Sequence, residues 1–173
     1  IYREVAHAKG LSFRLTIDDA LPLHITCDRN RLTQILGNLL SNACKFTEEG
    51  EVLVQVTGTF EPAGEGRLVC AVQDSGIGIK EEDLATIFSP FKQVQVPSTR
   101  IVGGTGLGLA MVYGIVTSHG GVITCESAPG RGTTFCIFFP ATALAMPDRE
   151  AVAPKTDRMA GSETILVVDD DPV

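Results

Sequence analysis

The sequence predicts a layered α/β domain in which helices pack on one face of a β-sheet. Strand-like and helix-like segments alternate along the chain and are not collected in separate blocks, which favours such layers. Hydrophobic residues make up 44% and charged residues 20% of the 173 residues, a composition typical of a globular domain. A domain of about 150 residues buries enough surface to fold without disulfides or metal ions. No motif typical of a parallel, doubly wound sheet is present in the sequence.

The first third of the chain predicts two short strands and a long helix. Residues 11–15 and 23–26 alternate apolar and polar side chains, and turn residues lie between them. Asp28 is a favourable N-cap for a helix that runs to about Phe46, and Glu49-Gly50 ends this region.

The middle of the chain predicts a strand pair and a short helix. Residues 52–56 and 68–72 are apolar runs joined by a loop rich in Gly and Pro at 61–66, which is typical of paired strands. Acidic residues from Glu81 onward open a short helix. Residues 89–104 form a loop that is longer than the usual length of about 4–6 residues, which indicates function or mobility.

The last third predicts a helix, a second strand pair and a tail. The helix runs from about Leu107 to His119 and is closed by two glycines. Residues 122–125 and 133–139 form the strand pair. Residues 141–162 are rich in Ala and Pro without a periodic apolar face, so we expect a linker, after which residues 163–173 begin a new unit.

Charge and composition argue against several classes of function. Lys and Arg number 14 and Asp and Glu number 21, which gives a formal net charge of −7. So acidic a chain is a poor partner for nucleic acids and for anionic membrane surfaces. No apolar run approaches the roughly 18 residues of a membrane span. The five cysteines show no CxxC spacing, so we expect reduced, mostly buried thiols in a cytoplasmic protein and no zinc site.

The start of the chain predicts that it is a piece of a longer protein. Residues 1–4 carry neither a Met nor the apolar segment of a signal peptide. An anchor of the parent protein in the inner membrane remains compatible with a cytoplasmic location of this piece.

The first motif that could carry chemistry is a polar row on the helix expected at 28–46. Counted at about 100° per residue from Leu32, the apolar side chains gather on one stripe, and Asn38, Asn42 and Lys45 share a row that flanks it. Two amides and a cation at this seam could hold a metal ion and an anion, because an amide oxygen is a ligand that Mg²⁺ accepts. Alone, the row slightly favours the alternative of an ordinary solvated helix flank.

The second motif, Asp74-Ser75-Gly76-Ile77-Gly78, directly follows a predicted strand. Glycines let a flat ligand approach the backbone closely, and a carboxylate only accepts hydrogen bonds. Asp74 would therefore favour adenine, whose exocyclic amine donates, over guanine, whose carbonyl would repel it. Alone, the motif could also be a common glycine-rich turn. It is not an EF-hand, because the further acidic ligands are missing.

The third motif spans residues 103–111, where several glycines lead directly into a predicted helix. Such a loop presents free backbone N–H groups and the positive end of the helix dipole to phosphates. The spacing matches neither a P-loop nor the GxGxxG fingerprint, and close packing at a helix entry is the alternative.

Two aromatic residues, Phe88 and Phe91, flank the start of the long loop. They could simply be core residues that anchor it. Alternatively, Lys92 and Arg100 could act with them as mobile cations that reach over phosphates, as in a lid.

The order of these motifs resembles that of the sensor histidine kinases. Residues 38–47 look like the N box of that family, and residues 74–79 look like its G1 box. Residues 87–91 resemble the F box, 104–109 the G2 box, and 130–135 the closing strand of the same module. The elements occur in the family order and with similar spacing over about residues 11–140, so chance is a poor explanation.

The resemblance implies a Bergerat-type ATP-binding fold, an α+β two-layer sandwich with a mixed sheet, helices on one face and ATP beneath a lid. It implies that Asn42 coordinates Mg²⁺, that Lys45 contacts phosphate, and that Asp74 accepts the adenine amino group with support from Thr133. The other residues that it assigns to nucleotide binding are Gly76, Gly78, Lys92, Gly104, Thr105, Gly106, Leu107 and Gly108. Lys92 stands where the family more commonly has Arg.

Residue 38 distinguishes the branches of this superfamily. Gyrase, mismatch-repair and chaperone ATPases place a Glu four residues before the metal-binding Asn, as a base that activates water, whereas this sequence has Asn38. An amide cannot take up a proton at neutral pH. We therefore expect phosphoryl transfer to another protein, with Asn38, Asn42 and Lys45 as the catalytic set and with hydrolysis suppressed. A superfamily ATPase, a protein-serine kinase and a non-catalytic nucleotide-binding interaction module are the alternatives.

The phosphoacceptor histidine of the family is not expected in this chain. In the family an acidic residue, Arg and Pro follow it, and none of His7, His24 and His119 fits that pattern. We therefore expect residues 1–10 to end a connection from dimerisation helices that carry the acceptor, and residues 11–140 to be the catalytic domain. The isolated chain should be a monomer that does not autophosphorylate, and the parent a homodimer.

The end of the chain resembles the start of a receiver domain. Residues 165–171 look like its first strand and acidic pair, which would be Asp169 and Asp170. The resemblance implies a hybrid kinase that passes its phosphoryl group to an Asp of its own receiver domain or of a separate response regulator. An apolar strand followed by acidic residues is common, so chance is the alternative here.

Overall fold

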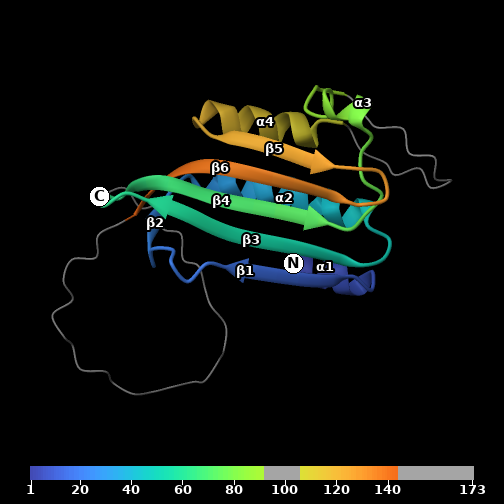
Figure 1. The fold of residues 1–173 in the computed structure, drawn as a ribbon, viewed down its shortest axis with the longest axis horizontal. Helices are drawn as coiled ribbons and strands as arrows, with labels where there is room; N and C mark the ends of the chain where they lie inside the picture. Colours follow the sequence, from blue (N-terminus) through green and yellow to red (C-terminus); the bar gives the residue numbers. More distant parts are fainter. Residues whose placement is uncertain (92–105, 144–173) are drawn as a thin grey trace, which may run out of the picture.

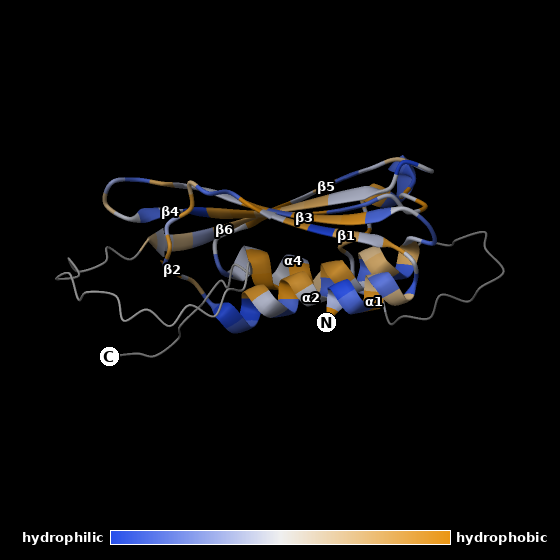
Figure 2. Ribbon diagram, turned by 90° about the horizontal axis from the view of Figure 1, so that it is seen from below, coloured by the Kyte–Doolittle hydropathy of each residue, from blue (hydrophilic) through white to orange (hydrophobic). Residues whose placement is uncertain are grey.

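The computed structural model describes residues 1–91 and 106–143. Their elements are α1 (Tyr2–Ala8), β1 (Ser12–Ile17), β2 (Ile25–Thr26), α2 (Arg29–Phe46), β3 (Glu51–Phe60), β4 (Glu65–Asp74), α3 (Glu81–Leu84), α4 (Gly108–Ser118), β5 (Val122–Ser127) and β6 (Thr133–Ala143). The strands form one sheet, and α1, α2 and α4 lie together on one side of it (Figure 1, Figure 2). The predicted two-layer α/β fold is confirmed.

The sheet is mixed. Its strand order is β1-β3-β4-β6-β2, and β5 pairs with β6 beside β2. Only β1 and β3 run parallel among the described strand pairs, and the others are antiparallel. A parallel pair needs a crossover connection, and the segment that contains α2 supplies it. This crossover is what places α2 on one face of the sheet, behind the central strands (Figure 1, Figure 2).

The core lies between the sheet and the helices. Alternate residues of the two central strands β3 and β4 face inward, and one stripe of α2 meets them. The buried residues of these elements include Leu32, Ile35, Leu39, Val52, Val54, Val56, Leu68, Cys70 and Val72. Each large apolar side chain buried here stabilises the fold by about 1.5–3 kcal/mol. All five cysteines are free, and Cys44 and Cys70 are buried while the other three are half-buried.

The chain before β1 forms a short helix that packs against the rest of the structure. This helix is α1, in which Ala6 is fully buried. That residues 1–10 end a connection from dimerisation helices stays a prediction. The Lys9 ammonium then donates to the carbonyl oxygens of Cys44 at 2.5 Å and Thr47 at 3.0 Å, at the C-terminal end of α2. A cation is favourable at this end of a helix dipole. These contacts attach the start of the chain to the C-terminal end of α2.

The predicted linker also begins later than the sequence indicates. β6 continues through Pro140 to Ala143, and Ala141 is buried, so residues 141–143 belong to the sheet. Pro140 lies opposite Arg67 of β4, and on the other edge of β6 the pairing with β5 ends at Phe138 before that with β2 starts at Thr142. Proline is tolerated in a strand where no ladder hydrogen bond is needed. Residues 144–173, with Asp169 and Asp170, lie outside the described residues.

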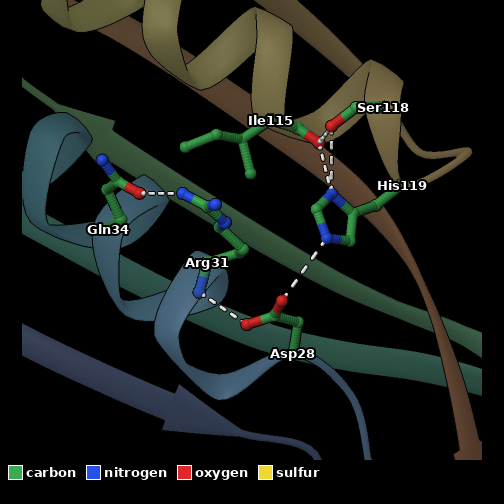
Figure 3. A network of polar contacts seen from close by, with 6 residues as sticks. All are labelled: Asp28, Arg31, Gln34, Ile115, Ser118 and His119. Carbon is green, nitrogen blue, oxygen red and sulfur yellow. Dashed lines mark hydrogen bonds and ion pairs between the residues drawn. The ribbon is translucent and has the colours of Figure 1, made fainter.

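A polar network joins the start of α2 to the end of α4 (Figure 3). Asp28 is the N-cap of α2, and its Oδ1 accepts a hydrogen bond from the Arg31 N–H at 2.9 Å. Its Oδ2 lies 3.5 Å from Nε2 of His119, the C-cap of α4. The His119 Nδ1 lies 2.9 Å from the Ile115 carbonyl oxygen. The predicted N-cap of α2 is confirmed, and the same Asp28 side chain also contacts the end of α4 through His119.

Candidate functional site

Asp74 ends β4 and is only 8% exposed. Its Oδ1 accepts a hydrogen bond from the Gly76 N–H at 2.8 Å, and the backbone N–H of Thr133, its cross-strand neighbour on β6, also donates to the carboxylate. Burial raises the pKa of the Asp74 carboxyl above its usual value, while these two N–H groups act in the opposite direction. Neither contact brings a positive charge, so the carboxylate is suited to accept from a neutral donor such as an amine.

The loop after Asp74 fits tightly between α2 and the turn that joins β5 to β6. A Cβ at position 76 would lie 2.4 Å from the carbonyl oxygen of Phe46, and a Cβ at position 78 would lie 2.0 Å from that of Ala128. Gly78 also has a φ of +69°. Only glycine fits at both positions, because any side chain would collide with backbone. Close approach at these glycines is thus required by the protein's own backbone.

The polar row of α2 lies where the sequence predicts it. Asn38, Asn42 and Lys45 are all half-buried, beside the buried stripe of the helix. The Asn38 Nδ2 donates to the Gln34 carbonyl oxygen at 2.9 Å, and the Lys45 Nζ lies 5.0 Å from the centroid of the Phe46 ring. No hydrogen bond is made by the Asn42 side chain within residues 1–91 and 106–143. Its amide oxygen is therefore open to a ligand.

The start of α4 lies against this row. A Cβ at Gly108, the first residue of α4, would be 3.0 Å from the Asn38 Oδ1. Gly106 has a φ of +68°, and the N-cap residue of the helix, Leu107, makes no side-chain capping hydrogen bond. The first N–H groups of a helix have no partner within it, so this end is suited to an anion.

These contacts place three candidate groups along one helix. Asn38 touches the start of α4, Phe46 touches the loop after Asp74, and Asn42 lies one turn from each of them on α2. The acceptor Asp74, the open amide of Asn42 and the helix start at Gly108 therefore border a common stretch of the molecule.

The two aromatic residues before the long loop behave differently. The Phe88 ring packs against Tyr113 with a centroid distance of 5.5 Å and against Phe135 at 6.3 Å, as expected for a core anchor. Phe91 is 76% exposed and has a φ of 63°, and its N–H donates to the Gly106 carbonyl oxygen at 3.1 Å. The core interpretation is thus wrong for Phe91. Lys92, Arg100, Gly104 and Thr105 lie outside the described residues.

Sequence reasoning did not find Ser127 or Gly132. Ser127 ends β5, and its hydroxyl contacts the Ile79 N–H, the Gly132 carbonyl and the Thr133 hydroxyl. Gly132 has a φ of +78°, and a Cβ there would lie 1.9 Å from the carbonyl oxygen of Asp74. Gly132 lies in the segment 130–135 that resembles the closing strand of the kinase module, so the sequence offered a signal for it. A lone serine at the end of a strand gives no such signal, because its contacts arise only from the strand pairing.

The comparison with known families decides the identity of the domain. The family described as "Histidine kinase-, DNA gyrase B-, and HSP90-like ATPase" matches residues 27–143. The chain belongs to this family. The predicted resemblance is thereby confirmed.

Individual relatives are named as sensor kinases. The autoinducer 2 sensor kinase/phosphatase LuxQ of Vibrio cholerae is 39% identical over 148 residues, which cover 86% of this chain and 17% of LuxQ. The signal transduction histidine-protein kinase BarA of Escherichia coli is 35% identical over 162 residues, which cover 94% of this chain and 17% of BarA. The chain thus spans only about a sixth of the length of these relatives.

Solved structures agree with this family. Full-length ShkA in complex with AMPPNP gives a TM-score of 0.65 at 33% identity, with 83% of this chain and 30% of ShkA covered. The catalytic domain of histidine kinase ThkA gives 0.59 at 28% identity, with 80% and 89% covered. The chain is therefore an ATP-binding domain of the histidine kinase type. Among the described helices, none is both long and apolar enough to span a membrane.

Proposed function

We propose that this chain is the catalytic ATP-binding domain of a hybrid sensor histidine kinase. It transfers the γ-phosphoryl group of ATP to a histidine on a dimerisation domain outside this chain, for relay to an Asp of a receiver domain. The observation that carries the proposal is the buried Asp74 carboxylate, which lacks a cationic partner in the contacts described above. The loop after Asp74 contacts Phe46 of α2, one helical turn from the open amide of Asn42. The kinase names of LuxQ and BarA support it.

In this proposal, one group of residues binds the adenine base and another group binds the phosphates. Asp74 accepts the adenine amino group, Thr133 completes the base end, and Gly76 and Gly78 hold the loop between them. The phosphates lie at the start of α4, where Gly104, Thr105, Gly106, Leu107 and Gly108 shape the loop and Lys45 and Lys92 supply charge. The start of α4 at Gly108, where the N-cap side chain makes no hydrogen bond, supports this direction of the nucleotide, because the first N–H groups of a helix can bind phosphate.

The residues present fit one magnesium ion that is held mainly by the nucleotide. Within the described residues there is no group of three or more His, Cys, Asp or Glu side chains that could hold a metal by itself. Mg²⁺ usually keeps several waters and takes one or two protein ligands besides phosphate oxygens, so the single amide oxygen of Asn42 suffices. When bound, the ion neutralises charge on the phosphates.

Transfer to a protein is favoured over hydrolysis because residue 38 is an amide. The Asn38 Nδ2 is engaged by the Gln34 carbonyl oxygen, and the Oδ1 faces Gly108. No group at this position can take a proton from water at neutral pH. The domain then works by orienting ATP toward an external nucleophile, since phosphoryl transfer depends chiefly on positioning and charge stabilisation.

The setting follows from this activity. Because ATP and a dimerisation domain are the proposed partners, we place the domain in the cytoplasm, as a monomer when isolated and as part of a homodimer in the parent. The acidic chain has no nucleic-acid role in this proposal.

Calorimetry and radiolabelled ATP test the proposal. The chain should bind ATP with Mg²⁺ more tightly than GTP, release phosphate slowly, and label an added dimerisation domain of its parent on an acid-labile phosphohistidine. A dimerisation domain without its acceptor histidine is the control. Equal affinities for ATP and GTP would contradict the role of Asp74. Rapid phosphate release by the chain alone, or an acid-stable label, would contradict histidine kinase activity.

A further inference from the structure

The hydroxyl group of Ser127 is fully used by three neighbours. Its Oγ accepts a hydrogen bond from the Ile79 N–H at 2.8 Å, donates to the Gly132 carbonyl oxygen at 2.8 Å, and lies 2.9 Å from the Thr133 Oγ1. A hydroxyl has one proton to donate and two lone pairs that accept. A carbonyl oxygen can only accept, so the Ser127 proton is committed to Gly132.

This commitment fixes the direction of the remaining contact. Two oxygens at 2.9 Å need a proton between them, and the Ser127 proton already points elsewhere. The Thr133 hydroxyl must therefore donate to Ser127. It keeps only its lone pairs for any other partner, so Thr133 acts as an acceptor.

Thr133 lies at the base end of the candidate site. It is 7% exposed, it pairs across the ladder with Asp74 on one side and with Ser127 on the other, and its backbone N–H donates to the Asp74 carboxylate. Two acceptors, a carboxylate and an oriented hydroxyl, thus stand next to each other. A purine with a 6-amino group can donate to this pair, whereas a 6-oxo group would meet lone pairs on both sides.

We propose that Ser127 is a positioning residue that holds the Thr133 hydroxyl as an acceptor beside Asp74 and thereby makes the site reject 6-oxopurine nucleotides. The inference rests on the proposed binding of ATP. It assigns part of the selectivity of the site for adenine to Ser127, a side chain that does not itself contact the nucleotide. Ser127 also ties the loop after β4 to the turn before β6 through Ile79. If Ser127 acted only through this structural link, its removal would lower the affinity for all nucleotides by the same factor.

The test compares ATP with inosine triphosphate, which carries a carbonyl oxygen in place of the 6-amino group. Calorimetry on the full 173-residue chain with Mg²⁺ gives the ratio of the two affinities for the wild type, Ser127→Ala and Ser127→Thr. In Ser127→Ala the Thr133 proton is free to turn toward a carbonyl, so the ratio should fall about tenfold. Ser127→Thr keeps the hydroxyl and should retain the wild-type ratio. An unchanged ratio in Ser127→Ala, with both affinities lowered equally, would overturn the inference.

A double-mutant cycle isolates the hydroxyl pair. In a Thr133→Val background there is no proton to turn, so adding Ser127→Ala should leave the ratio where Thr133→Val sets it. A tenfold fall in that background as well would contradict the mechanism. Thermal unfolding checks that each variant folds, and Ser127→Cys, a much weaker acceptor of similar size, takes the place of Ser127→Ala if that variant does not. A wild type that binds ATP but not selectively overturns this inference, and one that binds no nucleotide overturns the proposed function as well.

Discussion

Asp74 is buried at the end of β4, where two backbone N–H groups and, among the described residues, no cation meet its carboxylate. Burial raises the pKa of this carboxyl group. The charged form is therefore disfavoured in the folded, nucleotide-free domain, although the proposed role in adenine binding needs it as an acceptor. In the proposed role, Asp74 therefore serves adenine binding at some cost to the stability of the empty site.

This conflict predicts an unusual pH dependence for Asp74→Asn. Because the folded pKa is raised, the folded wild type binds more protons than the unfolded chain between the usual Asp pKa and the raised value, so its free energy of unfolding falls as pH rises through this window. In Asp74→Asn this fall in the free energy of unfolding is absent, because an amide does not titrate. The nucleotide-free variant should be more stable than the wild type at neutral pH, with the advantage vanishing below the usual Asp pKa. Urea unfolding over a pH series measures the difference.

The exposed Asp19, replaced by Asn, is the control for the loss of one negative charge. A variant Asp74→Asn that is less stable than the wild type by the same amount at every pH would show that the carboxylate stabilises the empty fold. That result would contradict the expectation that burial of the charged Asp74 carboxylate destabilises the nucleotide-free domain.

Gly132 and Gly130 form a matched pair for the turn between β5 and β6. Both have left-handed φ values, +78° and +72°, but only at Gly132 would a Cβ meet backbone, 1.9 Å from the Asp74 carbonyl oxygen. Gly130→Ala should cost about 1–2 kcal/mol from the backbone conformation alone. Gly132→Ala should cost clearly more and should also weaken ATP binding, because Asp74 must move. Urea unfolding and calorimetry measure both effects, and equal losses for the two variants would contradict the proposed close packing.

At the scale of elements, the sequence predicts what local pattern determines. α2 is predicted because Asp28 caps it and its apolar residues recur on one stripe, and that stripe also fixes the flanking position of Asn38 and Asn42. α1 is missed because a helix of seven residues has little intrinsic stability and depends on the burial of Ala6 against its neighbours.

The candidate site shows the same division. Asp74 and the glycines after it form a pattern within the sequence, so they could be found without a structure. The contribution of Ser127 could not, because its neighbours Ile79 and Thr133 come together only when β5 pairs with β6. Proline is normally a reason to end a strand, and β6 passes Pro140 only because β5 and β2 leave a gap at that edge.

The link between α2 and α4 predicts a pH-dependent effect of Asp28. The Arg31 N–H, followed by His119, holds the pKa of the Asp28 carboxyl below its usual value. A lowered folded pKa contributes stability above the usual Asp pKa that is lost as pH falls through the folded value. Asp28→Ala should therefore be less stable than the wild type at neutral pH and equal to it in strong acid, as measured by urea unfolding.

Asp28→Ser separates the two contacts of this side chain. Serine retains an N-cap acceptor but has no charge to offer His119, so its stability should lie between those of the wild type and Asp28→Ala. If Asp28→Ser is as unstable as Asp28→Ala, the cap does not provide the main contribution.

At the scale of the whole molecule, net charge and site chemistry make metal removal informative. The chain carries a formal charge of −7, so it repels the polyanionic triphosphate of ATP, and the proposed site offers the ion only one protein ligand, the amide of Asn42. Removal of Mg²⁺ with a chelator should weaken ATP binding at least about tenfold, which corresponds to about 1.4 kcal/mol. Adenosine, which has no phosphates and relies on Asp74, should bind equally well with and without Mg²⁺. Calorimetry in both buffers gives the comparison. Equal weakening of ATP and adenosine would mean that the metal supports the fold and not the phosphates, and an unchanged ATP affinity would exclude Asn42 as a metal ligand.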